Sequence, residues 1–428
     1  MTRGGKGGLS SAREMFAYLR SKGFFALLTG NFLGQFLSFT ALLVVAKTLS
    51  KAELGDARLL QSIGWLGGAL AMFGANTAVL KYCSENRGAD EREGIFAYAL
   101  RRLALTSLLT LGLIFLLREV GWLTASPGVR QWVLAYAFSI PLLALADLTL
   151  YYLQSQKRVH RGARMLAWVR AQSFVLIVAL TLVFGFRGFV WGVLAGSFLA
   201  LVPLGRELVS GWRARPLRLP GFDRLTWVTL WANAASVAMM YADLFILDRF
   251  NADRSEIGLY SLGALFALAA GQVSSTAMTI ATPYFSERAG DLEWLRPTLF
   301  RHQLKLALGS VALAALTVAL AWGLIEAVYG PSYRPTLLYT GILLGRFIAV
   351  SSVSLIGAAL LSNGLHKFNA WATTAGLAAA IALGVLGFAQ GGPWGVALGQ
   401  VGAGVVYAGV VLAGGRLLLS GRGSLPKG

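Results

Sequence analysis

The sequence predicts an all-α integral membrane protein with twelve transmembrane helices. Of its 428 residues 56% are hydrophobic and only 13% are charged, whereas soluble proteins carry about 25% charged residues. Apolar runs of about 18 or more residues recur along the chain, and each is long enough to span a bilayer as a helix. We place the runs at 24–46, 59–80, 103–117 (extending back towards Phe96), 131–153, 165–184, 188–205, 225–248, 257–282, 305–328, 335–361, 369–389 and 394–415.

The basic residues predict the orientation of these helices. The net charge is +19, with 38 Lys and Arg residues. With the N-terminus inside, the inner segments hold 28 of the 38, the outer loops hold nine, and Arg346 is the remainder. Because cytoplasmic loops are enriched in Lys and Arg, both termini are expected in the cytoplasm and the protein in the inner membrane. The charge indicates topology and contact with anionic lipids rather than nucleic-acid binding.

A basic, proline-containing stretch after the sixth run divides the chain into two halves of six helices each, as internal duplication would. The predicted segments are a basic amphipathic cytoplasmic segment at 1–22, an N-terminal lobe at 23–206, a cytoplasmic linker at 207–224, a C-terminal lobe at 225–417 and a cytoplasmic tail at 418–428.

A short motif recurs at the same place in both halves. SKAELG at 50–55 and DRSEIG at 253–258 align without gaps. Ser50 and Asp253 are N-cap residue types, and Glu53 and Glu256 follow three residues later, which is the spacing of a capping box. We therefore expect each motif to begin a membrane helix at its outer end.

Polar side chains inside the apolar runs are candidates for a substrate cavity. Asn31 and Gln35 lie one helical turn apart, Asn233 and Asp243 lie in the seventh run, and Gln272 lies in the eighth. Nearby Ser and Thr residues are equally compatible with helix packing, whereas the amides cost more to bury and favour a wet cavity.

Four charges fall well inside the runs, and each is expected to face protein or water. Asp147 and Arg170 come from neighbouring runs at similar depth, so they form either a structural ion pair or, if unpaired, a site where Asp147 couples transport to protons. Arg346 lies near the centre of its run. It either pairs with Asp243 or binds an anion, since a guanidinium can donate two hydrogen bonds to phosphate oxygens.

No feature of the sequence points to an enzyme or a cofactor. The single cysteine, Cys83, cannot form an intramolecular disulfide. The histidines, His160, His302 and His366, are far apart, so no metal site is expected. The longest outer loop, between Arg118 and Arg130, contains one acidic residue and offers no paired carboxylates.

Several segments together resemble the polysaccharide and oligosaccharide flippases of the superfamily that also contains the multidrug and toxic-compound exporters. The resemblance covers most of the chain and rests on AKTLSKAELGDARLLQS at 46–62, GANTAVLKYCSE at 74–85, YADLFILDRFNADRSEIGLYSLGALFALAAG at 241–271, TPYFSE at 282–287, EAVYGPSYRPTLLYTGILL at 326–344 and SNGLHKFNAW at 362–371.

The resemblance implies two six-helix lobes around a central cavity, which opens alternately to either side. It also implies a cargo: an isoprenoid-pyrophosphate-linked oligosaccharide moved from the inner to the outer leaflet for cell-surface polysaccharide biosynthesis. The expected partners are that lipid-linked glycan, membrane lipids and glycan-assembly enzymes, and the expected state is a monomer. Two alternatives stay open within the superfamily: a cation-coupled multidrug exporter and a lipid II flippase.

The predicted topology can be tested with reporter fusions. A reporter fused after Ala125 should lie outside and one fused after Gly211 should lie inside, because the Lys and Arg asymmetry fixes the orientation. Alkaline phosphatase and green fluorescent protein activities measure the two locations. Reporters that both lie on one side of the membrane would contradict the topology.

Overall fold

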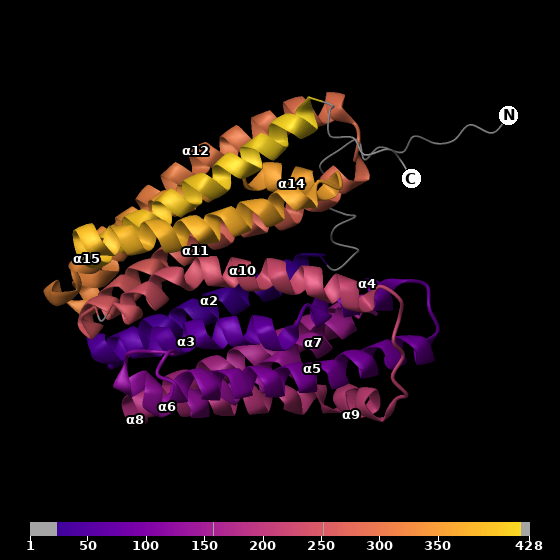
Figure 1. The fold of residues 1–428 in the computed structure, drawn as a ribbon, viewed down its shortest axis with the longest axis horizontal. Helices are drawn as coiled ribbons and strands as arrows, with labels where there is room; N and C mark the ends of the chain where they lie inside the picture. The colour runs from indigo at the N-terminus through magenta and orange to yellow at the C-terminus, as the bar shows by residue number, and fades with distance from the viewer. Residues whose placement is uncertain (1–23, 157, 251, 421–428) are drawn as a thin grey trace. The chain divides into compact units, whose positions relative to one another are not determined.

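The computed structural model describes residues 24–156, 158–250 and 252–420, and side chains in its first helix from residue 36 onward. All the secondary-structure elements of the described residues are helices (Figure 1). The helices of the first half are α2 (Phe24–Thr48), α3 (Lys51–Met72), α4 (Ala75–Ser84), α5 (Ala89–Glu119), α6 (Pro127–Ala137), α7 (Ser139–Ser155), α8 (Val159–Leu201), the short η1 (Val202–Leu204) and α9 (Gly205–Arg213). Those of the second half are α10 (Phe222–Arg249), α11 (Arg254–Glu287), α12 (Leu292–Leu324), η2 (Ile325–Tyr329), η3 (Pro331–Tyr333), α13 (Pro335–Ser351), α14 (Ser354–Ser362) and α15 (His366–Leu419).

These helices make the chain a multi-pass membrane protein. Within the described residues, seven helices are long and apolar enough to cross a membrane, and two bent pairs, α3 with α4 and α6 with α7, bring the number to nine. The predicted basic segment at 1–22 and most of the tail at 418–428 lie outside the described residues.

The long elements α8 and α15 each consist of two helices joined by a sharp turn. The turns fall in the predicted gaps between neighbouring apolar runs, at 185–187 and 390–393. Gly185 in α8 and Gly392 in α15 have φ angles of 58° and 61°, which interrupt the helix. In α8 the chain folds back on itself, because a Cβ at Gly192 would lie 2.8 Å from the Cα of Ile177 and one at Gly196 would lie 3.2 Å from the hydroxyl of Ser173. With both hairpins counted as two spans and α2 as one, the predicted twelve spans are confirmed.

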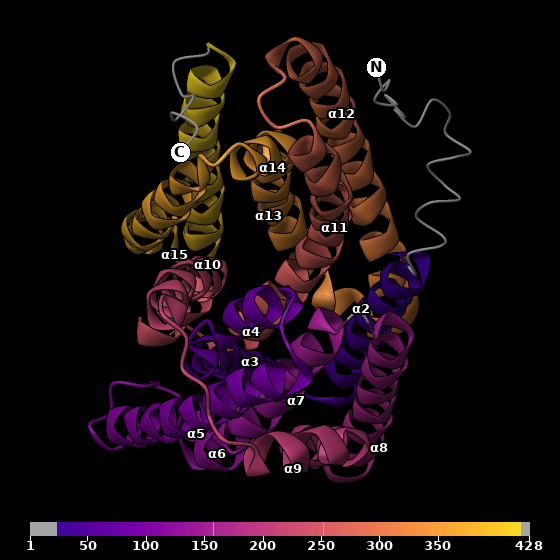
Figure 2. The same ribbon diagram turned by 90° about the vertical axis from the view of Figure 1, so that its right-hand side faces the viewer.

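The residues form two compact units, which are discontinuous in sequence. One comprises 1–43, 71–110 and 138–227, and the other comprises 44–70, 111–137 and 228–428. The first contains an apolar core between α7, α8 and η1 that includes Leu153, Val169 and Leu204. In the second, α13 and α14 each pack against both α11 and α15 (Figure 2).

The second unit joins parts of both halves of the chain through the duplicated motif. A Cβ at Gly55 would lie 2.7 Å from the carbonyl oxygen of Arg254, and one at Gly258 would overlap the carbonyl oxygen of Lys51. Each motif therefore places its glycine against the backbone of the other motif, so the first turns of α3 and α11 cross in direct backbone contact. Small residues permit such close approach between membrane helices.

The two predicted capping boxes differ in the structure. In the first, the Ser50 hydroxyl accepts the Glu53 amide at 3.2 Å, and the Ser50 amide donates to the Glu53 carboxylate at 3.0 Å. In the second, Asp253 caps the helix by accepting the Ser255 amide at 2.9 Å. The prediction that Glu256 would accept the Asp253 amide in return is wrong. The Glu256 carboxylate instead accepts the Tyr339 hydroxyl at 2.6 Å.

Further bonds fix the same end of the second unit. Asp248 accepts the Arg254 guanidinium at 2.5 Å and the Ala125 amide at 3.0 Å. Lys51 donates to the Ser332 carbonyl at 2.8 Å. The loop before α6 and the turn before α13 are thereby tied to the crossing of α3 and α11.

Replacing Gly258 with alanine should separate the crossing helices. The added methyl group meets the Lys51 backbone, which cannot rotate away, so we expect a loss of roughly 1–3 kcal/mol of stability. Thermal unfolding of the purified protein in detergent measures the change. Gly271→Ala in the same helix is the matched control, because a Cβ there meets nothing within 4 Å, and equal melting temperatures for the two variants would contradict the crossing.

Candidate substrate site and buried charges

Arg346 is held by protein groups from two neighbouring helices. On α13, its Nη1 donates to the Gln400 side-chain oxygen of α15 at 2.7 Å, and its Nη2 donates to the Met239 carbonyl of α10 at 3.4 Å. Gly404 allows α15 to approach closely, since a Cβ there would lie 3.0 Å from the Cγ of Arg346. The arginine therefore faces the protein interior, as the cost of a charge in lipid requires.

Asp243 is a buried carboxylate with two direct donors. Its side chain is 4% exposed. It accepts the Tyr260 hydroxyl at 2.7 Å and the Leu244 amide at 2.9 Å. The ring of Tyr260 lies 5.2 Å from that of Tyr339, whose hydroxyl binds Glu256. Polar groups of α10, α11 and α13 thus meet in the interior of the second unit.

The direct ion pair predicted as one alternative for Arg346 and Asp243 is absent among the described contacts. Both charges have other partners: Gln400 and Met239 bind the guanidinium, and Tyr260 and Leu244 bind the carboxylate. The two charges attract each other at longer range. The direct partners of the guanidinium are therefore neutral hydrogen-bond acceptors.

A second buried arginine, Arg58, was not predicted as a site residue. It is 4% exposed and donates from Nη1 to the Gln61 side-chain oxygen at 2.7 Å. Its Nε and Nη2 have no hydrogen-bond partner in the described structure, and its charge also acts on Asp243. The apolar run was predicted to begin at residue 59, which leaves Arg58 in the outer loop. The capping box instead starts α3 at Lys51, so Arg58 lies two turns inside the helix.

No described hydrogen bond or ion pair joins the other predicted cavity residues to Arg346. Asn233 is half-buried on α10, and Gln272 is exposed on α11, where its side-chain oxygen accepts the Ser275 hydroxyl at 3.5 Å. Asn31 and Gln35 belong to α2, but their side chains lie outside the described residues. A role for these four residues in a cavity stays a prediction.

Asp147 and Arg170 do not form the direct ion pair that was one of their two predicted roles. No ion pair within 4.0 Å joins them in the described part of the first unit, although their charges interact at longer range. Asp147 is exposed on α7 and Arg170 is half-buried on α8. The two residues come from adjacent helices, as expected, but no described ion pair joins their charged groups.

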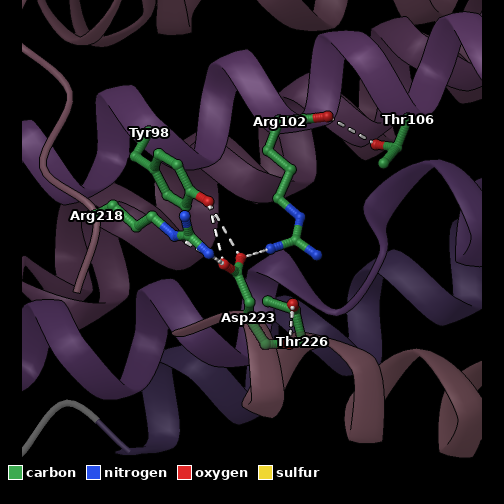
Figure 3. Close-up of polar contacts among 6 residues, drawn as sticks. All are labelled: Tyr98, Arg102, Thr106, Arg218, Asp223 and Thr226. Carbon is green, nitrogen blue, oxygen red and sulfur yellow. Dashed lines mark hydrogen bonds and ion pairs between the residues drawn. The ribbon is translucent and has the colours of Figure 1, made fainter. Parts of the chain in front are cut away.

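A charged cluster at the start of α10 lies outside all of these predictions. Asp223 accepts hydrogen bonds from the Arg218 guanidinium at 2.9 Å and the Tyr98 hydroxyl at 3.1 Å, and it forms an ion pair with Arg102 (Figure 3). The hydrogen bond that the Arg218 guanidinium donates to Asp223 raises the pKa of Arg218 above its ordinary value. Three segments of the first unit are joined at this carboxylate.

The fold defined by these helices is that of multi-pass exporters and flippases. The chain is similar to lipid II flippase MurJ in an inward closed conformation, with a TM-score of 0.72, 16% identity and coverage of 90% of this chain and 86% of that one. It is similar to an inward-facing multidrug resistance MATE family transporter of the MOP superfamily, with a TM-score of 0.71, 15% identity and coverage of 91% and 96%. A MOP superfamily transporter from Pyrococcus furiosus, described as having a binding pocket of reverse polarity, has a TM-score of 0.65, 14% identity and coverage of 92% and 95%.

The family itself follows from a sequence match. Residues 44–338 match the model of the polysaccharide biosynthesis protein family. Because the match covers more than half of the chain, the protein belongs to this family, and the predicted relationship is confirmed. No curated protein sequence matches this chain.

The hydrogen bond between Arg346 and Gln400 should contribute measurably to stability. Gln400→Leu leaves a half-buried guanidinium donor unpaired, so we expect unfolding to become easier by roughly 1–3 kcal/mol. Gln400→Glu keeps an acceptor and should lose less. Thermal unfolding in detergent compares these variants with Gln272→Leu, which changes an exposed glutamine and should be nearly neutral; a Gln400→Leu protein as stable as this control would contradict the assignment.

Proposed function

We propose that the protein is a flippase that moves an isoprenoid-pyrophosphate-linked oligosaccharide from the inner to the outer leaflet for cell-surface polysaccharide biosynthesis. The family match and the exporter fold support transport. Family and fold relatives of this kind act as transporters, so we assign no enzymatic activity. The proposed location is the inner membrane with both termini in the cytoplasm, in accordance with the distribution of Lys and Arg.

The observation that favours an anionic, phosphate-linked cargo is the environment of Arg346. Its guanidinium is bonded to an amide oxygen and a carbonyl oxygen rather than to a carboxylate. Neutral acceptors leave the guanidinium without a direct counter-ion, so a pyrophosphate can displace them and form stronger, charge-assisted hydrogen bonds. Arg58, with two buried donors lacking partners, supplies a second positive group. Asn31, Gln35, Asn233, Asp243 and Gln272 are proposed to line the path of the sugar.

The duplicated motif suggests how the cargo would cross. The contact between Gly55 and Gly258 unites 44–70 of the first half with the second half of the chain. With the topology proposed above, this contact closes the outer side, and we propose that it separates when the lobes at 23–206 and 225–417 rock to release cargo outward. For the cavity to open alternately to each side, the contact between Gly55 and Gly258 must separate and form again in each transport cycle.

Asp147 is the proposed coupling group. It is an exposed carboxylate inside a predicted membrane span, and no direct ion pair with its predicted partner, Arg170, is among the described contacts. A carboxylate without a direct counter-ion can exchange protons more readily than one fixed in an ion pair. Arg170 would stabilise its ionised form from a distance.

The two alternatives within the superfamily differ in cargo. A multidrug exporter of cationic compounds requires acidic groups facing the cargo. In this protein the charge near the middle of its span that lacks a direct counter-ion is basic, namely Arg346. A lipid II flippase shares the pyrophosphate chemistry, and its distinction from other glycan flippases depends on the sugar.

Substitution of Arg346 tests the proposal in a strain that lacks its native glycan flippase. Arg346→Ala should reduce surface glycan export by more than roughly tenfold, because two charge-assisted hydrogen bonds are lost. Arg346→Lys should keep part of the activity, since the charge remains but the bidentate geometry does not. Glycan immunoblots measure export, and membrane abundance shows that each variant is folded.

Arg301→Ala is the matched control, because Arg301 is exposed on α12. It should export like the unmodified protein. Full export by a correctly inserted Arg346→Ala protein would remove the arginine from the substrate site and leave it a role in packing.

A further inference from the structure

A surface cavity of about 740 Å³ lies beside the charged cluster at the start of α10. Its lining includes Arg101 and Arg102 of α5, Arg218 of the segment between α9 and α10, and Trp227 of α10. All of these residues belong to the first compact unit. None of them entered the transport proposal, so the cavity requires its own explanation.

The wall of this cavity is fixed by backbone contacts. The segment between α9 and α10 crosses α5 (Figure 2), where the Leu217 amide donates to the Gly94 carbonyl at 2.8 Å. A Cβ at Gly94 would lie 2.9 Å from the Arg215 carbonyl oxygen, so the two backbones are in direct contact. Arg218 is thereby held opposite α5 in a defined position.

The cavity is positively charged. Three arginines and one carboxylate, Asp223, line it. Asp223 binds both Arg102 and Arg218 (Figure 3), so one negative charge is shared between two guanidinium groups. Arg101 is exposed, and its hydrogen bond among the described residues is a long one of 3.5 Å to the Ala214 carbonyl. The Arg218 side chain is 70% exposed. Both arginines thus have donors free to bind an anion.

Apolar side chains adjoin these charges. Leu105, one turn along α5 from Arg101, is 59% exposed, and Trp227 is 60% exposed. Trp227 packs edge-on against Phe73, with ring centroids 4.6 Å apart, and Arg102 lies over the Phe73 ring. Exposed tryptophan and leucine beside arginine at the end of a membrane helix are typical of the lipid–water interface. A soluble anion would gain nothing from the apolar groups.

We propose that this cavity binds the phosphate of an anionic phospholipid, with Arg101 and Arg218 contacting the headgroup and Leu105 and Trp227 contacting the upper acyl chains. The Lys and Arg distribution places the site at the cytoplasmic leaflet, where anionic lipids attract basic residues. A bound lipid would strengthen the attachment of the connecting segment to α5. The inference is independent of the cargo proposed above, because it concerns lipid that stays bound.

Lipid binding by the purified full-length protein tests this proposal. Native mass spectrometry and thermal unfolding compare added phosphatidylglycerol, phosphatidylcholine and inorganic pyrophosphate. The Arg101→Gln/Arg218→Gln protein keeps Arg102 bound to Asp223, so the cluster retains an ion pair. Arg301→Gln/Lys305→Gln removes the same charge from exposed positions of α12 and is the matched control.

Phosphatidylglycerol should bind and raise the melting temperature of the unmodified and control proteins, and its affinity should fall roughly 10- to 30-fold in the Arg101→Gln/Arg218→Gln protein. Phosphatidylcholine should bind equally weakly to all three. Equal losses in the two double variants would show a diffuse charge effect and overturn the site. Pyrophosphate binding with the same dependence on Arg101 and Arg218, unaccompanied by phosphatidylglycerol binding, would overturn the choice of lipid.

Discussion

The high cost of leaving a polar group unpartnered in hydrocarbon governs the interior of this protein. Arg346 shows the effect of this constraint. Its side chain reaches Gln400 and the Met239 carbonyl, so α10, α13 and α15 must meet at one level. Asp243 and Tyr260 impose a similar requirement on α10 and α11. The polar contacts therefore fix the relative positions of helices that apolar packing alone would leave free to slide.

Much of the fold could be predicted because its signals are local. Apolar runs identify spans, and the gaps between runs coincide with the hairpin turns at Gly185 and Gly392. The first capping box formed as its spacing indicates. The second did so only in part, since Tyr339 is 83 residues away from the Glu256 that it binds. A partner at that distance along the chain leaves no local signal.

The candidate site was less predictable for the same reason. Arg346 can be recognised from the sequence as a charge within an apolar run. Its partner Gln400 is a single amide among small residues, so nothing in the sequence marks it as part of the site. Arg58 was assigned to a loop because the apolar run was expected to begin at residue 59, whereas α3 begins eight residues earlier with Lys51. For Asp147 and Arg170, helix rise predicts similar depth, but rotation about the helix axes decides whether side chains touch. A single sequence does not specify that rotation.

The duplicated motif connects the fold with the proposed transport. Its two copies cap helices, and their glycines form the crossing that joins 44–70 to the second half. A contact between two backbones has no side chains to rearrange, so it can separate and re-form without repacking. The basic groups Arg58 and Arg346 lie in the same unit as this crossing, so opening it would change the surroundings of the proposed anion site.

Reconstituted transport tests the central claim most directly. The purified protein would be placed in vesicles with a fluorescent isoprenoid-pyrophosphate-linked oligosaccharide, and a membrane-impermeant quencher would report the accessible fraction. The flippase account predicts that quenching extends beyond the outer-leaflet fraction to nearly all of the label, with little movement of a fluorescent cationic drug. Quenching that stops at the level of protein-free vesicles, together with rapid movement of the cationic compound, would contradict it.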